Sequence, residues 1–95
     1  MNKAEIKWLA HGALLFNLSP KFRMISLEIE KGLKALVVTT EELNEEEKDL
    51  FYSFVGEIEG HFDEIINIDT EILVDGKTSI DDLPRLSILV HAFYE

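Results

Sequence analysis

The sequence predicts an α+β domain with elements in the order α-β-β-α-β-β. Two stretches repeat apolar residues at helical spacing, four stretches alternate or run apolar as strands do, and turn residues separate them. We expect an antiparallel or mixed four-stranded sheet with both helices packed on one face. A chain of 95 residues can bury one modest core, so residues 1–95 are expected to form a single domain.

Residues 3–17 are predicted to form the first helix. Four residues recur at helical spacing and are expected to face the core, namely Ile6, Leu9, Ala13 and Phe16. Asn2 can cap the start of this helix, and Asn17 is expected to end it in the left-handed conformation. The Ser19-Pro20 pair then prevents the helix from continuing. The N-terminal stretch is therefore interpreted as a helix and not as a signal peptide.

Residues 22–30 are predicted to form a strand, because apolar and polar residues alternate there. One face carries Ile25, Leu27 and Ile29, and the other carries Ser26, Glu28 and Glu30. Lys31-Gly32 is typical of a hairpin turn in which the glycine supplies a positive φ. Residues 33–39 are mostly apolar and are expected to form the second, largely buried strand.

The second helix is predicted over residues 45–60. Asn44 followed by Glu47 fits a capping box, and three glutamates fall in the first turn, where the helix dipole favours anions. The apolar stripe that follows has helical spacing and comprises Leu50, Phe51, Phe54, Val55, Ile58 and Phe62.

Two more strands are expected at residues 64–74 and 85–94, joined by a loop at 76–84 that is too long for a tight hairpin. The first alternates, with Ile66, Ile68, Thr70, Ile72 and Val74 on one face and Asn67, Asp69 and Glu71 on the other. The last strand is apolar on both faces. We expect it to be central, or covered by a helix on one side and partly on the other. The sheet face opposite the helices is expected to be open.

The net charge of −10 is unevenly spread. Residues 1–40 hold six basic and three acidic side chains, whereas residues 41–82 hold two basic and fifteen acidic ones. Such a surface repels phosphate backbones and anionic lipids, so we expect neither nucleic acid nor membrane as a partner. No apolar run approaches the ~20 residues that span a bilayer. A basic protein would be attracted to the acidic residues, although these acids also favour solubility.

Catalytic and metal-binding patterns are missing from the sequence. The chain has no cysteine, so disulfides and thiolate sites are excluded, and a reducing compartment such as the cytoplasm is expected. His61 and Asp63 lack further ligands at metal-site spacing, and the many carboxylate pairs arise from the density of acids. Phosphate-binding glycine loops and nucleophile motifs are not found. We therefore expect no enzyme activity, no cofactor and no metal.

The order of elements resembles that of a family of small bacterial immunity proteins, which protect a cell from its own polymorphic or contact-dependent growth inhibition toxins. The resemblance rests on the helix-to-strand stretch LLFNLSPKFRMISLEIE, the acidic capped helix TTEELNEEEKDLFYSFVGEIEGHF, the strand EIINIDTEIL and the terminal Phe93-Tyr94-Glu95. It covers about residues 4–95. The resemblance implies an antitoxin that occludes a basic toxin, often a nuclease.

The predicted partner-binding residues are four acids of the open sheet face and four further acids at the start of the second helix and in the loop before the last strand. They are Glu28, Glu30, Glu45, Glu46, Asp69, Glu71, Asp81 and Asp82. Charges at the rim of such an interface set the association rate and its salt dependence. The alternative is a non-catalytic homodimer or assembly subunit that pairs through the open sheet face with Leu89 and Phe93.

Overall fold

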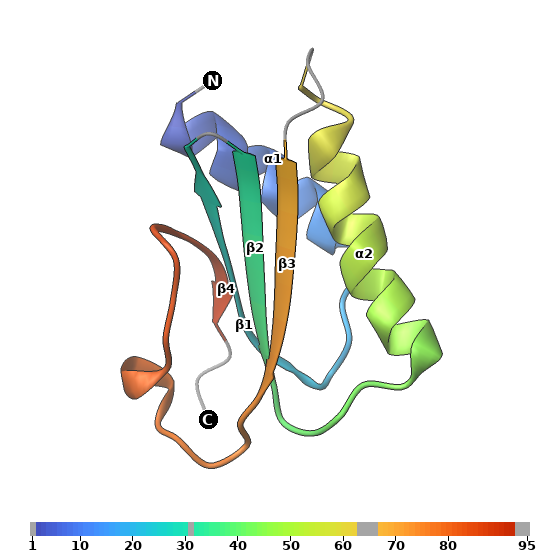
Figure 1. Ribbon diagram of the computed structural model, residues 1–95, viewed down its shortest axis with the longest axis vertical. Coiled ribbons are helices and arrows are strands. Elements are labelled where there is room, and N and C mark those ends of the chain that lie inside the picture. The colour runs from blue at the N-terminus through green and yellow to red at the C-terminus, as the bar shows by residue number, and fades with distance from the viewer. Residues whose placement is uncertain (1, 31, 63–66, 93–95) are drawn as a thin grey trace.

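The elements follow one another as predicted in the computed structural model, which describes residues 2–30, 32–62 and 67–92 (Figure 1). They are α1 (Lys3–Leu14), β1 (Phe22–Ile29), β2 (Gly32–Thr39), α2 (Glu45–Glu59), β3 (Asn67–Val74), the short 3₁₀ helix η1 (Ile80–Asp82) and β4 (Ile88–Ala92). Within these residues the four strands form one mixed sheet in the order β3-β2-β1-β4. This confirms the α+β prediction.

The sheet is mixed because its connections differ. The β1–β2 connection is short, so these strands are antiparallel, whereas the connection from β2 to β3 contains α2 and leaves them parallel. β4 returns to pair antiparallel with β1. The expectation that the last strand would be central is wrong, because β4 lies at an edge, although α1 packs against it.

Helix α1 begins where predicted and ends earlier. Asn2 Oδ1 accepts a 2.9 Å hydrogen bond from the backbone N–H of Glu5, which satisfies a free donor of the first turn. The helix ends at Leu14, and the left-handed cap predicted at Asn17 is wrong, since no described residue has a positive φ. Asn17 is instead buried, and its Nδ2 donates to the carbonyl oxygen of Ala13 at 2.8 Å. The side chain thereby satisfies a carbonyl of the last turn.

Helix α2 is capped as predicted. Asn44 Oδ1 accepts from the backbone N–H of Glu47 at 2.8 Å, and Glu47 Oε1 accepts from the N–H of Asn44 at 3.0 Å. The reciprocal bonds satisfy two donors at the helix start. The helix buries Phe51, Phe54, Val55 and Ile58.

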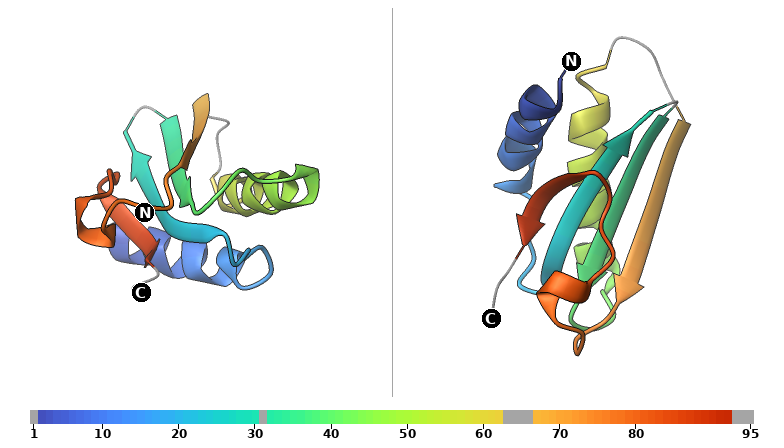
Figure 2. Two further views of the ribbon diagram at one scale, coloured as in Figure 1. Left: turned by 90° about the horizontal axis from the view of Figure 1, so that it is seen from below. Right: turned by 90° about the vertical axis from the view of Figure 1, so that its left-hand side faces the viewer.

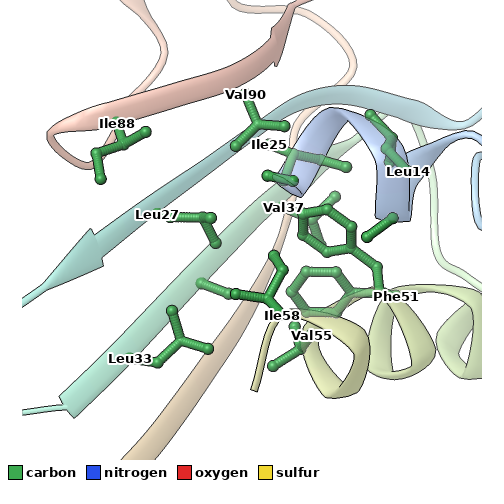
Figure 3. Close-up of a cluster of buried hydrophobic side chains, with 14 of the residues drawn as sticks. Leu14, Ile25, Leu27, Leu33, Val37, Phe51, Val55, Ile58, Ile88 and Val90 are labelled. Carbon is green, nitrogen blue, oxygen red and sulfur yellow. The ribbon is translucent and has the colours of Figure 1, made fainter. Parts of the chain in front are cut away.

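The main core lies between the two helices and the sheet (Figure 3). Alternate residues of the strands point into it, including Ile25, Leu27, Leu33, Val37, Ile88 and Val90. They meet Leu14 of α1 and the buried stripe of α2. Burying a side chain of this size stabilises the fold by about 1.5–3 kcal/mol, so both helices are held on this face of the sheet.

The opposite sheet face is half covered, and the prediction of an open face is wrong for that half. Residues 75–87 fold back over it, and Ile80 and Leu83 pack against Met24, Leu36 and Val38 in a second apolar cluster (Figure 2). Leu89 packs against this cluster too, so it is not free for the predicted sheet-face dimer. Phe93, the other residue of that prediction, lies outside the described residues.

Polar side chains of β1 hold this covering segment in place. Arg23 is 5% exposed, and its guanidinium donates to the carbonyl oxygens of Asp75 at 2.7 Å and Thr78 at 2.6 Å. Ser26 Oγ accepts a 2.9 Å bond from the N–H of Leu86. Since Leu86 belongs to this segment, β4 starts at Ile88 and not at residue 85.

Gly32 is required for close approach of strands and not for a positive φ, so that part of the hairpin prediction is wrong. A Cβ at this position would collide with the carbonyl oxygen of Asn67, which pairs with Gly32 across the β2–β3 ladder. Lys31 and the predicted strand residues 64–66 lie outside the described residues, as do residues 93 and 94.

Candidate functional site

Three of the predicted partner-binding acids share the uncovered half of the sheet face. Glu28 of β1 and Asp69 of β3 are both register partners of Lys34 in β2. In the neighbouring row, Ser26 and Glu71 flank Leu36. Because residues in register lie side by side across a sheet, Glu28, Asp69 and Glu71 form one acidic surface, which we call the sheet acids.

Lys34 stands in the middle of the sheet acids, and sequence reasoning did not include it. Its side chain is exposed, and no carboxylate oxygen of the described residues lies within 4.0 Å of its Nζ. Lys34 is the register partner of Glu28 in the β1–β2 hairpin, so both side chains lie on the same face. The sequence would have indicated the position of Lys34 if the hairpin register had been known. Lys34 partly neutralises the surface.

Glu30, Asp81 and Asp82 border this surface at two different places. Glu30 follows the end of β1 and is exposed. Asp81 and Asp82 are exposed on η1, within the segment that covers the other half of the same face. All three can therefore contribute charge around the sheet acids without lying in the same rows.

Glu45 and Glu46 are not brought together with the sheet acids. Both lie in the first turn of α2, which packs on the opposite face of the sheet (Figure 1). They are exposed there beside Glu42 and Asp49. The predicted partner-binding acids therefore lie on two different surfaces. The reason is that α2, which connects β2 to β3, packs on the sheet face opposite the sheet acids.

Part of the acidic run at residues 41–49 is structural. Glu47 Oε1 lies 2.7 Å from Lys21 Nζ, and Oε2 accepts a 3.1 Å bond from Ser19 Oγ. The backbone N–H of Asn44, followed by Lys21, lowers the pKa of Glu47 below its ordinary value. The hydrogen bond to Glu47 in turn raises the pKa of Lys21. Lys21 also lies 3.6 Å from Glu41.

Most other acids described between residues 41 and 82 form no salt bridge. Within the described ranges, ion pairs reach only Glu41, Glu45, Glu47 and Asp75. The remaining described carboxylates, among them Asp69, Glu71, Asp81 and Asp82, face solvent without a salt bridge. Their charge is therefore available to a partner.

A second surface, on α1, is apolar. Trp8, Leu15 and Phe16 are 76%, 79% and 82% exposed. They line a surface hollow of about 670 Å³ that continues past Gly12 to Glu57 and His61 near the end of α2. We call Trp8, Leu15 and Phe16 the α1 apolar surface. The prediction that Phe16 faces the core is therefore wrong.

The error at Phe16 has a simple origin. The core-facing residues of α1 are Ile6, Ala10, Ala13 and Leu14, whose spacing is as helical as that of the predicted set. A helix with two apolar stripes can bury only one of them in its own domain. The sequence signal for this surface was a second group of apolar residues at helical spacing, Trp8 and Leu15, beside the group that is buried.

The histidines do not assemble a site among the described residues, where no three His, Asp or Glu side chains are grouped to hold a metal ion. His11 Nε2 donates to the carbonyl oxygen of Val90 at 2.6 Å and ties α1 to β4. Burial, and then the charge of nearby His11, lowers the pKa of His91. Nor does any helix in the described ranges have the length and apolarity needed to cross a membrane.

Comparison with known proteins returned no relative. No protein-family model matches the chain, and no curated protein matches it. The resemblance to immunity proteins therefore stays a prediction, and any functional inference depends on the two surfaces described above.

Proposed function

We propose that this protein is a non-catalytic antitoxin of the immunity type that binds and occludes a basic toxin domain of the nuclease class in the cytoplasm. The observation that carries the proposal is the set of exposed carboxylates without salt bridges on and around one sheet face. A nuclease domain presents basic side chains where phosphate binds, and these side chains complement such a surface.

The sheet acids are suited to be the centre of the interface. They stand on β1 and β3, the two strands that flank β2, and the β1–β2 and β2–β3 ladders fix the backbone positions from which their carboxylates project. Preorganised charges lose little conformational entropy on association. Lys34 lies among the sheet acids and would repel a partner whose surface is uniformly basic. The protein would therefore bind a partner with one acid opposite Lys34 in preference.

The acids of α2 have a different role in this proposal. Glu45 and Glu46 lie on the opposite side of the sheet from the sheet acids, so one flat partner surface cannot cover both. Their field still adds to the attraction at long range. They should therefore affect the association rate at low salt and have little effect on the dissociation rate.

The proposal is tested by using the full chain as bait for proteins of its own host at low salt, with elution by a salt gradient. A basic protein should be retained, should elute sharply, and should lose its nuclease or other toxic activity when the bait is added back. Retention of no basic protein, or of one whose activity the bait leaves intact, would contradict the antitoxin proposal.

Charge-reversal variants test the surface. The double variant Asp69→Lys and Glu71→Lys should raise the Kd for that protein by about tenfold or more, through faster dissociation as well as slower association. The matched control is the double variant Asp49→Lys and Glu57→Lys, which makes the same change of charge at two exposed acids of α2 and should change the Kd much less. Lys34→Gln should speed association. Equal effects of the sheet and control variants would move the interface elsewhere.

A further inference from the structure

The α1 apolar surface is as large as the largest apolar patch on a typical monomer, and such patches are often functional. Two aromatic side chains and a leucine expose on the order of 500 Å² together, whereas isolated apolar residues on a monomer need no explanation. α1 lies on the outer side of the helix layer, where a partner can reach it (Figure 2). Two such surfaces in contact would bury about 1,000 Å², near the lower limit for a specific interface.

We propose that α1 pairs with α1 of a second copy of this chain, in an antiparallel arrangement whose two-fold axis passes near Gly12. This homodimer would use the helix layer and leave the sheet acids free. It is independent of the antitoxin proposal, because neither interface uses the residues of the other.

Charge favours a second copy at this surface. Two molecules of net charge −10 repel each other, so they can associate only where acids are sparse. The α1 segment from residue 2 to residue 18 carries Lys3 and Lys7 against a single acid, Glu5. Of the described acids in residues 41–82, Glu57 alone lines the hollow beside α1, so contact through α1 keeps the others away from the interface.

The residue positions in α1 and in the turn that follows it suit a two-fold axis. Trp8 lies in α1 four residues before Gly12, and Phe16 lies in the turn four residues after it, so an antiparallel partner would place Trp8 of each copy against Phe16 of the other. A two-fold interface requires this kind of self-complementarity. Gly12 is exposed, and an added Cβ would meet nothing within 4 Å in the monomer. A glycine at the crossing point lets two helices approach closely.

The experiment is sedimentation equilibrium of the full chain from about 1 μM to about 1 mM, with Trp8 fluorescence recorded over the same range. Trp8 is the sole tryptophan, so its emission reports on this surface alone. We expect a reversible dimer and a shift of the emission to shorter wavelength as it forms. Added salt should strengthen the dimer, because it screens the repulsion between the copies. Salt should weaken binding to a basic partner.

Two variants and their two controls locate the interface. Phe16→Glu should raise the dimer Kd by about tenfold or more, whereas Tyr52→Glu, at an exposed aromatic residue of α2, should not. Gly12→Leu should weaken the dimer by a similar factor while raising the thermal stability of the monomer, because leucine is the better helix former. Gly56→Leu is its matched control, since a Cβ there also meets nothing within 4 Å. It should stabilise the monomer and leave the dimer intact.

Two results would overturn the proposal. A chain that stays monomeric up to about 1 mM would show that a second copy does not bind the α1 apolar surface. If Phe16→Glu then lost binding to the basic partner, the α1 apolar surface would be assigned to that partner. A dimer that persists unchanged in both Phe16→Glu and Gly12→Leu would place the interface on another face. Failure of the host-protein capture would leave these measurements unaffected.

Discussion

Lys21 Nζ lies 2.7 Å from Oε1 of Glu47, and this contact joins the segment before β1 to the first turn of α2. The same carboxylate accepts the backbone N–H of Asn44 and the hydroxyl of Ser19. Glu47 thus caps its own helix and fixes the chain that leads from α1 into the sheet. Of the three glutamates in this first turn, it has the most structural contacts.

Glu47→Gln should lower the thermal stability of the protein at neutral pH and have little effect at acidic pH. The pKa of Glu47 is lowered in the folded state, so its contribution is present above the ordinary glutamate pKa and is lost as the pH falls through the folded value. Thermal melts of wild type and variant at pH 7 and at about pH 3 measure the difference.

Glu46→Gln is the control for this prediction. Glu46 is exposed in the same helical turn, and its carboxylate accepts no hydrogen bond from the described residues. It should leave the melting temperature nearly unchanged. Equal destabilisation by the two variants would show that the helix dipole, and not the contacts of Glu47, stabilises this turn.

Gly32→Ala should destabilise the fold by about 1–3 kcal/mol, because its Cβ collides with the backbone carbonyl of Asn67 and the two strands must separate. Denaturant unfolding measures the loss. Gly56→Ala, in the exposed part of α2, is expected to stabilise by about 0.5–1 kcal/mol through helix propensity. A neutral Gly32→Ala would mean that the β2–β3 pairing at this end is loose.

Asp75→Asn should loosen the segment that covers the sheet face. Hydrogen bonds from the hydroxyl and backbone of Thr78, and then from the backbone of Lys77, lower the pKa of Asp75 to about 2. The ionised form therefore contributes stability above about pH 4, and this contribution is lost as the pH falls toward 2. We expect faster amide exchange at Thr78 in the variant at pH 6.

The difference in melting temperature between wild type and Asp75→Asn should shrink as the pH falls below about 4. Asp81→Asn is the control, since Asp81 is exposed and its carboxylate accepts no hydrogen bond from the described part of the chain. A difference that stays constant with pH would show that the neutral Asp75 side chain holds the turn equally well.

Local patterns predicted the elements well, and the N-terminal helix caps best of all. Asn44 and Glu47 form the predicted capping box because both partners lie within one turn of helix, so no distant residue can alter the outcome. The alternation in β1 and β3 likewise placed Glu28, Asp69 and Glu71 on one face. These features depend on backbone periodicity, which a few neighbouring residues determine.

The sequence by itself determined the order of elements, the alternating faces of β1 and β3, and the uneven charge. Only the tertiary structure decided that β4 is an edge strand, that residues 75–87 cover half of the sheet face, and that Lys34 stands between Glu28 and Asp69. It also decided which apolar stripe of α1 is buried, and left Phe16 in solvent. The physical reason is that strand order and helix rotation depend on contacts between residues far apart in the chain, and local spacing does not distinguish the competing arrangements.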